Sequence, residues 1–162
     1  RLVPDSVVIG LVREKLTDPS YAKGFILDGF PRTVPQAEEL GKVLDEQGIR
    51  LNRVINFQVS RAEIVKRLSG RRSCPKCQAT YHVEFAPSKE AGVCDRCKDT
   101  LVQRSDDQRE AIETRLKVYE EQTAPLIGFY EKKNILSHLE SEGPVESVYQ
   151  SLSKVLAAYD TA

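Results

Sequence analysis

Four cysteines are the residues whose types and spacing point most clearly to chemistry. They form two Cys-x-x-Cys pairs, Cys74 with Cys77 and Cys94 with Cys97, and sixteen residues separate the pairs. This spacing falls within the range of four-cysteine zinc sites, in which each pair supplies two thiolates to a tetrahedral ion. Because four protein thiolates fill every position around the ion, the predicted zinc is structural rather than catalytic.

Other interpretations of the cysteine cluster stay open at this stage. The thiols could form two disulfides or remain free, although the reducing cytosol favours a metal site over disulfides. Iron is also chemically allowed in a cage of four thiolates.

Arginines lie on both sides of the cysteine segment. Arg67 and Arg71 precede it and are four residues apart, so on a continuing helix they would share a face. Arg104 and Arg115 follow it. The planar guanidinium group suits bidentate binding of phosphate and stays charged at any working pH. A single arginine in a chain with 24 basic residues is more often a solvated surface group. The prediction of a phosphate site therefore rests on their shared placement at the two ends of one segment.

Asp28 ends a short apolar run, residues 24–28, that we expect to form a buried strand. Ligands bind beyond the carboxyl ends of strands in open α/β sheets, and an acid there can orient Mg²⁺ or its waters. Gly29 would let the backbone approach a ligand closely, and Arg32 could clamp a phosphate. The Asp-Gly pair alone is equally typical of an ordinary turn.

Strands and helices alternate along the rest of the chain. Further strands are expected at residues 53–59 and 134–139. Alternating elements of this kind predict an α/β fold with a mostly parallel sheet, interrupted by an inserted subdomain over residues 71–104. Capping residues place the starts of the predicted helices at Asp5, Thr33, Ser60, Ser105 and Gly143, with a kink or restart at Pro125.

Composition excludes several classes of protein. The 162 residues contain 24 Lys and Arg against 24 Asp and Glu, and this zero net charge argues against a surface built for nucleic acid or anionic lipid. No apolar run is long enough to span a bilayer, and no charged leader is followed by an apolar region. We therefore expect a soluble cytoplasmic protein.

Taken together, these residues resemble the adenylate kinase family in its zinc-bearing bacterial form. Residues 24–33, Gly-Phe-Ile-Leu-Asp-Gly-Phe-Pro-Arg-Thr, are similar to a motif of that family. The resemblance runs from Arg1 nearly to the end of the chain. The other matching segments are residues 35–37, 70–72, the four cysteines, 80–82, 104–107 and 123–127.

The resemblance implies reversible phosphoryl transfer from MgATP to AMP, giving two ADP. It implies a P-loop kinase-like parallel sheet flanked by helices, with an inserted zinc-binding lid that closes over the substrates. The implied regions are a core with the end of the AMP-binding part (1–69), the lid (70–107) and the C-terminal core (108–162). Zinc would be structural, Mg²⁺ would accompany ATP, and the protein would be a monomer that binds neither nucleic acid nor membrane.

The resemblance also implies roles for individual residues. AMP would be contacted by Arg1, Leu2, Val3, Gly29, Phe30, Pro31, Arg32, Arg104, Arg115 and the amide of Gln36. ATP would be held by Arg67, which lies against adenine, and by Arg71, Thr80, Tyr81 and the backbone of Gly143. The catalytic set would be Arg71, Arg104, Arg115 and Asp28. Asp106 and Asp107 would order the lid hinge and pair with arginines on closure. Apart from the resemblance, His82 lies five residues after Cys77 and could compete as a metal ligand. Because four cysteines already suffice, we expect His82 at the surface or facing a nucleotide.

One feature departs from the family's pattern. No Gly-x-x-x-x-Gly-Lys-[Ser/Thr] sequence occurs, and the only Gly-Lys pair, Gly41-Lys42, is followed by Val43 and has Gln36 in place of the first glycine. In the family this loop precedes the segments matched here. We therefore expect that the N-terminal P-loop part of the core is missing and that this chain alone is inactive, whereas the full-length protein is active.

Two alternatives compete with the kinase. A zinc ribbon with basic flanks could bind nucleic acid, although the zero net charge and the acids among those basic residues weigh against it. A fragment that keeps zinc and some nucleotide affinity could instead assist another chain.

Overall fold

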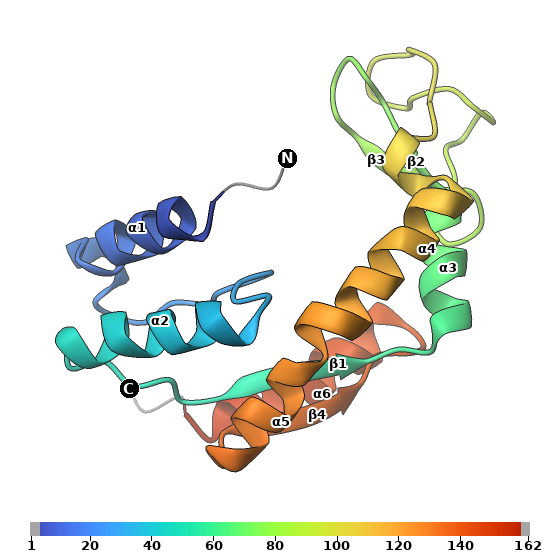
Figure 1. Ribbon diagram of the computed structural model, residues 1–162. Helices are drawn as coiled ribbons and strands as arrows, with labels where there is room; N and C mark the ends of the chain where they lie inside the picture. Colours follow the sequence, from blue (N-terminus) through green and yellow to red (C-terminus); the bar gives the residue numbers. More distant parts are fainter. Residues whose placement is uncertain (1–3, 160–162) are drawn as a thin grey trace. The chain divides into compact units, whose positions relative to one another are not determined.

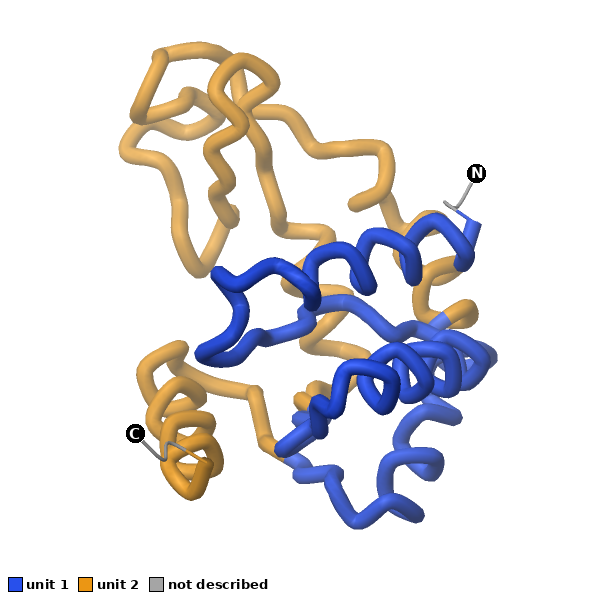
Figure 2. The backbone as a smooth tube through the Cα atoms, turned by 90° about the vertical axis from the view of Figure 1, so that its left-hand side faces the viewer, with its two compact units in different colours: residues 1–56, 119–138 blue, residues 57–118, 139–162 orange. Residues whose placement is uncertain are grey.

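The computed structural model describes residues 4–159, which fall into two compact units (Figure 2). The first unit comprises the chain up to residue 56 and residues 119–138, and the second comprises residues 57–118 and the chain from residue 139. Each unit thus combines segments that are far apart in the sequence. Arg1, Leu2 and Val3, which were predicted to contact AMP, lie outside the described residues.

The first unit is built mainly from helices. The core of this unit includes Ala37, Leu126 and Tyr130, which pack with Val54 and Leu136. Its helices are α1 (Asp5–Leu16), the 3-10 turn η1 (Pro19–Tyr21), α2 (Val34–Glu46), the π-helical turn η3 (Tyr119–Thr123) and α5 (Pro125–Lys132).

Local signals correctly predicted α2. The Thr33 hydroxyl accepts a hydrogen bond from the Gln36 N–H at 3.3 Å and caps the helix. The predicted inward residues Ala37, Leu40 and Leu44 are buried, because positions three and four apart share one face. The restart predicted at Pro125 is also confirmed, since α5 begins there.

β1 (Val54–Gln58) and β4 (Leu136–Glu140) pair as a two-stranded sheet (Figure 1). The Val54 N–H donates to the Ile135 carbonyl at 2.8 Å, and the Ser141 N–H donates to the Gln58 carbonyl at 3.0 Å. Both contacts advance in the same direction along the two strands, so the pair is parallel. The predicted α/β fold with a parallel sheet flanked by helices is confirmed.

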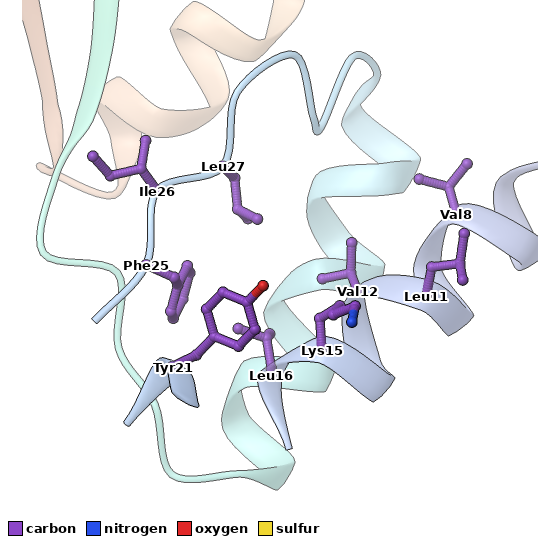
Figure 3. Close-up of a pocket in the computed structure, with 9 residues that line it drawn as sticks. All are labelled: Val8, Leu11, Val12, Lys15, Leu16, Tyr21, Phe25, Ile26 and Leu27. Atoms are coloured by element: carbon purple, nitrogen blue, oxygen red, sulfur yellow. The ribbon is translucent and has the colours of Figure 1, made fainter. Parts of the chain in front are cut away.

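Residues 24–28 do not form the predicted strand. A strand needs a neighbour to accept and donate its backbone hydrogen bonds, and no described strand pairs with this run. The side chains of Phe25 and Leu27 instead line an apolar pocket of about 280 Å³ beside α1, together with Ile26, which is 85% exposed as a residue (Figure 3).

The second unit carries the cysteine segment. β2 and β3 pair antiparallel, with Arg71 opposite His82 and Ser73 opposite Thr80. Among residues 4–159, no helix is long and apolar enough to cross a membrane. The elements of this unit are α3 (Arg61–Ser69), β2 (Arg71–Ser73), β3 (Thr80–His82), the 3-10 turn η2 (Ser105–Asp107), α4 (Arg109–Val118) and α6 (Val145–Ala157).

Two of the predicted helix starts are wrong. Ser105 does not cap α4, because residues 105–107 form a 3-10 turn and Gln108 is extended, so the helix begins at Arg109. Asp5 is not the N-cap of α1, because Pro4 takes that position and makes no side-chain capping bond. The Asp5 carboxylate accepts a hydrogen bond from Gln36 instead. The N-cap predicted at Ser60 is confirmed, since its hydroxyl accepts from the Glu63 N–H.

Candidate functional site

Two turns of the same backbone geometry carry the four cysteines. In the first turn the Gln78 N–H donates to the Cys74 carbonyl at 2.9 Å, and in the second the Lys98 N–H donates to the Cys94 carbonyl at 2.9 Å. Gln78 and Lys98 both have left-handed backbone conformations, with φ of 60° and 62°. Each turn therefore presents its two thiols on the same side.

The four sulfur atoms have the spacing of a tetrahedral metal site. All four lie within 4.8 Å of one another, with Cys74 Sγ 3.3 Å from Cys97 Sγ and Cys77 Sγ 3.5 Å from Cys94 Sγ. Zn–S bonds of about 2.3 Å place tetrahedral sulfurs about 3.8 Å apart. None of the four is in a disulfide, which removes that alternative. The cluster could hold a metal ion, and His82 is not part of it.

Hydrogen bonds make the four thiols unequal. Burial disfavours the Cys94 thiolate, but hydrogen bonds from the Tyr81 hydroxyl and from nearby backbone N–H groups lower the pKa of Cys94 to about 6. The Asp99 N–H favours the Cys97 thiolate, but contact with Cys74 and burial raise the pKa of Cys97 to about 12. Without a cation, four neighbouring thiols cannot all ionise, whereas a bound dication stabilises every thiolate. This donor set suits a soft divalent metal.

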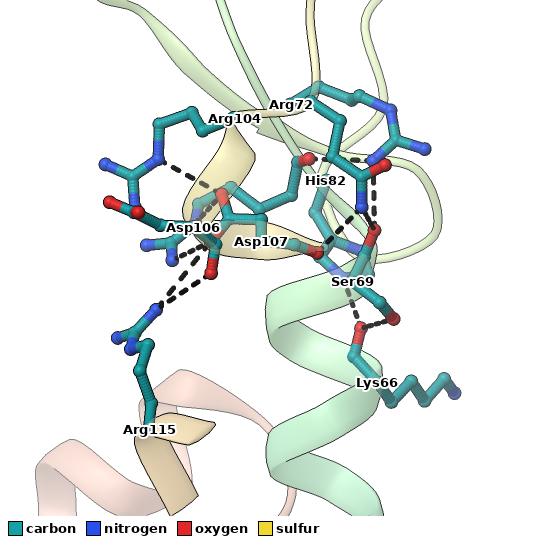
Figure 4. Close-up of polar contacts among 10 residues, drawn as sticks. Lys66, Ser69, Arg72, His82, Arg104, Asp106, Asp107 and Arg115 are labelled. Atoms are coloured by element: carbon teal, nitrogen blue, oxygen red, sulfur yellow. Dashed lines mark hydrogen bonds and ion pairs between the residues drawn. The ribbon is translucent and has the colours of Figure 1, made fainter. Parts of the chain in front are cut away.

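Asp107 is the centre of the second group of predicted residues. Its side chain is fully buried, and it accepts hydrogen bonds from Arg71 Nε at 3.0 Å and Arg71 Nη2 at 2.6 Å. Arg104 Nε donates to the same carboxylate at 3.1 Å, and Arg115 Nη1 lies 3.9 Å from it (Figure 4). The structure thus brings together the three arginines of the predicted catalytic set.

The charge on Asp107 depends on these arginines. Burial alone would raise the pKa of the Asp107 carboxyl, but hydrogen bonds and attraction from Arg71 and Arg104 hold this pKa below its usual value. The arginines themselves are only partly buried, with side-chain exposures of 28% for Arg71, 46% for Arg104 and 50% for Arg115. Part of each arginine side chain therefore remains accessible to solvent.

Gln103 joins the two ends of the cysteine segment, a role that the sequence analysis missed. Its Nε2 donates to the Ser69 carbonyl at 3.0 Å and to the Asp107 carbonyl at 2.8 Å. Arg72 Nη1 donates to the same Ser69 carbonyl at 3.0 Å. These contacts connect the end of α3 to η2, on either side of residues 70–104. A glutamine beside a motif residue gives no distinctive signal in the sequence.

His82 packs directly over Gly70 and was not predicted to do so. Its Nδ1 accepts from the N–H groups of Glu84 and Phe85 at 3.1 Å, and its Nε2 lies 3.2 Å from the Lys66 carbonyl. The ring also stacks on Phe85 with centroids 4.4 Å apart. A Cβ atom at Gly70 would lie 2.2 Å from His82 Nε2, so only glycine leaves room for this ring.

The other residues of the second unit that were predicted to bind ATP are not part of the arginine cluster around Asp107. Arg67 is held by Glu63 at 2.6 Å and donates to the Ser141 carbonyl at 3.1 Å. The Tyr81 hydroxyl lies 3.5 Å from Cys94 Sγ, so it faces the cysteine cluster. Thr80 is exposed at the start of β3. Gly143 precedes α6 with φ of 112°.

The first unit holds the loop from Asp28 to Gln36. Arg32 folds back over Gly29, with its Nε donating to the Gly29 carbonyl at 2.7 Å. Gly29 has φ of 73°, and a Cβ there would lie 3.3 Å from Arg32 Nη2. The Arg32 carbonyl accepts from Thr123 Oγ1 at 2.8 Å. Asp28 is exposed, and the peptide between Phe30 and Pro31 is cis.

Comparison with known proteins identifies the family. The adenylate kinase family model matches residues 1–135. An adenylate kinase of Citrifermentans bemidjiense is 53% identical over 157 residues, which cover 97% of this chain and 73% of the relative. The chain belongs to the adenylate kinase family. A second adenylate kinase, from Carboxydothermus hydrogenoformans, is 52% identical over 96% of this chain and 72% of its own length. One from Methanothrix thermoacetophila is 45% identical over 98% of this chain and 74% of its own length.

Family membership confirms the resemblance seen in the sequence. It makes the chain a phosphotransferase of the nucleoside monophosphate kinase type. It also favours the kinase over the nucleic-acid-binding zinc ribbon. The arginine cluster around Asp107 is then a group of phosphate-binding candidates in an adenylate kinase.

Replacement of one cysteine tests the metal site. Cys77→Ser should abolish stoichiometric metal binding and lower Tm by about 10 °C or more, because several kcal/mol of metal-linked stability are lost and 1 kcal/mol corresponds to about 2–4 °C in a chain of this size. Elemental analysis and calorimetry measure the two effects. Lys89→Ala, on an exposed residue of the same segment, should keep the metal. A Cys77→Ser protein with unchanged metal content would contradict this assignment.

Asp107→Asn tests the arginine cluster through stability. Because the folded pKa of Asp107 lies below the unfolded pKa, its contribution to stability is present above about pH 4 and is lost as the pH falls through the folded pKa. The substitution should therefore cost about 3 kcal/mol of unfolding free energy at pH 7 and weaken the acid dependence. Denaturant unfolding at several pH values measures both, with Asp106→Asn as the neighbouring control. Equal stability of the two variants would contradict the prediction.

Gly70→Ala tests the packing of His82. The added Cβ must displace the ring, so we expect a loss of about 1–3 kcal/mol in unfolding free energy. Gly10→Ala is the matched control, since Gly10 lies in α1 with nothing within 4 Å of its Cβ position. It should be neutral or stabilise the chain by up to about 1 kcal/mol. Similar unfolding curves for the two variants would contradict the prediction, because they would show that the His82 ring moves aside at little cost in free energy.

Proposed function

We propose that this adenylate kinase transfers a phosphoryl group reversibly from MgATP to AMP, giving two ADP. The observation that carries the proposal is the convergence of Arg71, Arg104 and Arg115 on Asp107. Three guanidinium groups exceed the charge of the two acids there, Asp106 and Asp107. The surplus positive charge and the exposed N–H groups suit an incoming phosphate.

The arrangement fits the needs of phosphoryl transfer. This reaction offers a protein little covalent chemistry, so catalysis comes from positioning and from stabilising charge on the transferred group. Arg71, Arg104 and Arg115 would neutralise the charge that spreads over the phosphoryl oxygens. Asp28 would orient the Mg²⁺ that accompanies ATP, and that ion would supply positive charge to neutralise the phosphates.

Residues 70–107 would act as a lid held rigid by structural zinc. The two ends of this segment meet at the Gln103 amide, which contacts Ser69 and Asp107. Motion would concentrate at these ends, near Asp106 and Asp107. Closure would exclude water, which would otherwise compete with AMP as acceptor. On either side of the lid, residues 1–69 and 108–162 would form the core.

The proposed nucleotide contacts form two sets, one for ATP and one for AMP. ATP would contact Arg67, Arg71, Thr80, Tyr81 and Gly143. Since the Tyr81 hydroxyl faces the cysteines, its ring or backbone would make the ATP contact. Arg67, held by Glu63, would lie against adenine as a cation over an aromatic face. AMP would contact Gly29, Phe30, Pro31, Arg32 and Gln36, together with Arg1, Leu2, Val3, Arg104 and Arg115.

The absence of a phosphate-binding loop sequence limits what this polypeptide does alone. The 162 residues contain no Gly-x-x-x-x-Gly-Lys-[Ser/Thr] sequence. We infer that the chain by itself has negligible kinase activity, because nothing supplies the backbone cradle and the lysine for the ATP phosphates. A monomeric cytoplasmic protein that binds no nucleic acid remains our prediction.

A coupled assay of ADP formation tests this proposal. The 162-residue chain alone should show negligible turnover, and addition of the part of the Citrifermentans bemidjiense relative that this chain does not match, in trans or by fusion, should restore it. In the restored enzyme Arg104→Ala should lower kcat by about 100-fold or more. Arg109→Ala, on the first residue of α4, should leave activity unchanged. Robust turnover by the chain alone would refute its proposed inactivity. An Arg104→Ala enzyme as active as the control would refute the proposed role of the arginine cluster in phosphoryl transfer.

A further inference from the structure

The side-chain amide of Gln36 has one orientation that its neighbours permit. Its Nε2 donates to Asp5 Oδ1 at 2.7 Å, and its Oε1 accepts from the Arg32 N–H at 2.7 Å. A carboxylate only accepts hydrogen bonds and a peptide N–H only donates, so these contacts distinguish the two ends of the amide. Rotating the amide by 180° would break both hydrogen bonds. It would place the amide oxygen against the Asp5 carboxylate and the amide N–H groups against the Arg32 N–H.

The backbone around Arg32 fixes one of these two partners. Thr33 caps α2, the Arg32 carbonyl accepts from Thr123 Oγ1, and Arg32 Nε donates to the Gly29 carbonyl. The Arg32 N–H therefore has a defined direction before any ligand binds. It faces the carbonyl end of the Gln36 amide.

Asp5 is the other partner, and it comes from a different helix. It lies in the first turn of α1, 31 residues away in sequence from Gln36, and makes no side-chain cap for its own helix. Its carboxylate is the group that prevents the amide from presenting its carbonyl on this side. α1 and α2 also contact each other within the same unit, so the pairing is part of how the two helices pack.

The bound amide keeps one N–H and one carbonyl lone pair for a ligand. A 6-aminopurine offers an acceptor at N1 beside an amino donor, whereas a 6-oxopurine offers a donor at N1 beside a carbonyl acceptor. A freely rotating amide can pair with either edge. A fixed amide pairs with one edge only. Opposite the other edge it places donor against donor and acceptor against acceptor. Such a mismatch is how a polar site rejects an analogue.

We propose that Asp5 is a positioning residue that locks the Gln36 amide, so that the monophosphate site selects a 6-aminopurine over a 6-oxopurine. This inference rests on the proposed contact between Gln36 and the base of AMP. Asp5 acts through Gln36 and touches no nucleotide itself. Removal of the Asp5 carboxylate should change the ratio between the affinities for 6-aminopurine and 6-oxopurine monophosphates, and not only weaken both affinities.

Binding of AMP and of IMP, its 6-oxo counterpart, tests the inference on the 162-residue chain by titration calorimetry. Asp5→Ala should reduce the AMP-to-IMP affinity ratio by about three- to tenfold, the range expected for one exposed hydrogen bond. Asp5→Asn should keep AMP affinity close to that of the unsubstituted chain, because its carbonyl still accepts from Nε2. It should also reduce the ratio, because its amino group tolerates the rotated Gln36 amide.

The controls separate this inference from the proposed function. Asp45→Ala removes an exposed acid from α2 and should leave both affinities unchanged. Gln36→Ala should abolish most of the preference for AMP. If the Gln36→Ala variant keeps that preference, or the unsubstituted chain binds no AMP, the proposed role of Gln36 fails and the inference fails with it. If Gln36→Ala loses the preference but Asp5→Ala keeps the ratio or weakens both ligands equally, the inference alone is overturned.

Discussion

A carboxylate that is removed from water needs compensating charge nearby, and Asp107 obtains it from Arg71, Arg104 and Arg115. This requirement links β2, the η2 turn and α4 through one buried group. It also holds three phosphate-binding candidates in place before a nucleotide arrives. A phosphate that joins them meets guanidinium groups already directed to one place, which lowers the cost of reorganisation during transfer.

The cysteine segment solves a different problem, which is how a short insert can be rigid. Its buried cluster consists of Cys74, Ala79, Cys94 and Leu101, far less apolar surface than an independent domain needs. Sulfur–metal bonds would replace the missing core and hold the two turns together. A stiff insert joined near Gln103 can move as one body, which is what the proposed lid requires.

The proposed AMP site depends on a smaller contact of the same kind. Gln36 is neutral and could rotate freely at the start of a helix. Asp5 and the Arg32 N–H give its amide one orientation. In both units, therefore, an acidic side chain orients the groups that are proposed to contact the substrate. The acid itself is not one of the proposed contacts. Positioning of this kind suits an enzyme whose reaction depends on alignment and charge.

The family, the cysteine cluster and much of the local structure could be predicted from the residues and their spacing. The N-caps at Thr33 and Ser60 were predictable because a cap involves residues only three positions apart. The parallel pairing of β1 with β4 followed from the alternation of strands and helices. The Cys-x-x-Cys spacing predicted the two cysteine turns for the same reason, since each turn is a local structure.

Which distant groups meet depends on the packing of the folded chain. Residues 24–28 have the composition of a strand but lack a described partner, and pairing depends on neighbours that local composition does not reveal. Asp5 looked like a helix cap and serves Gln36 instead, while His82 fills the space over Gly70. The convergence of three arginines on Asp107 depends on how β2, η2 and α4 pack. Spacing along the chain cannot encode that packing, because it arises from contacts between residues as far as 36 positions apart, as between Arg71 and Asp107.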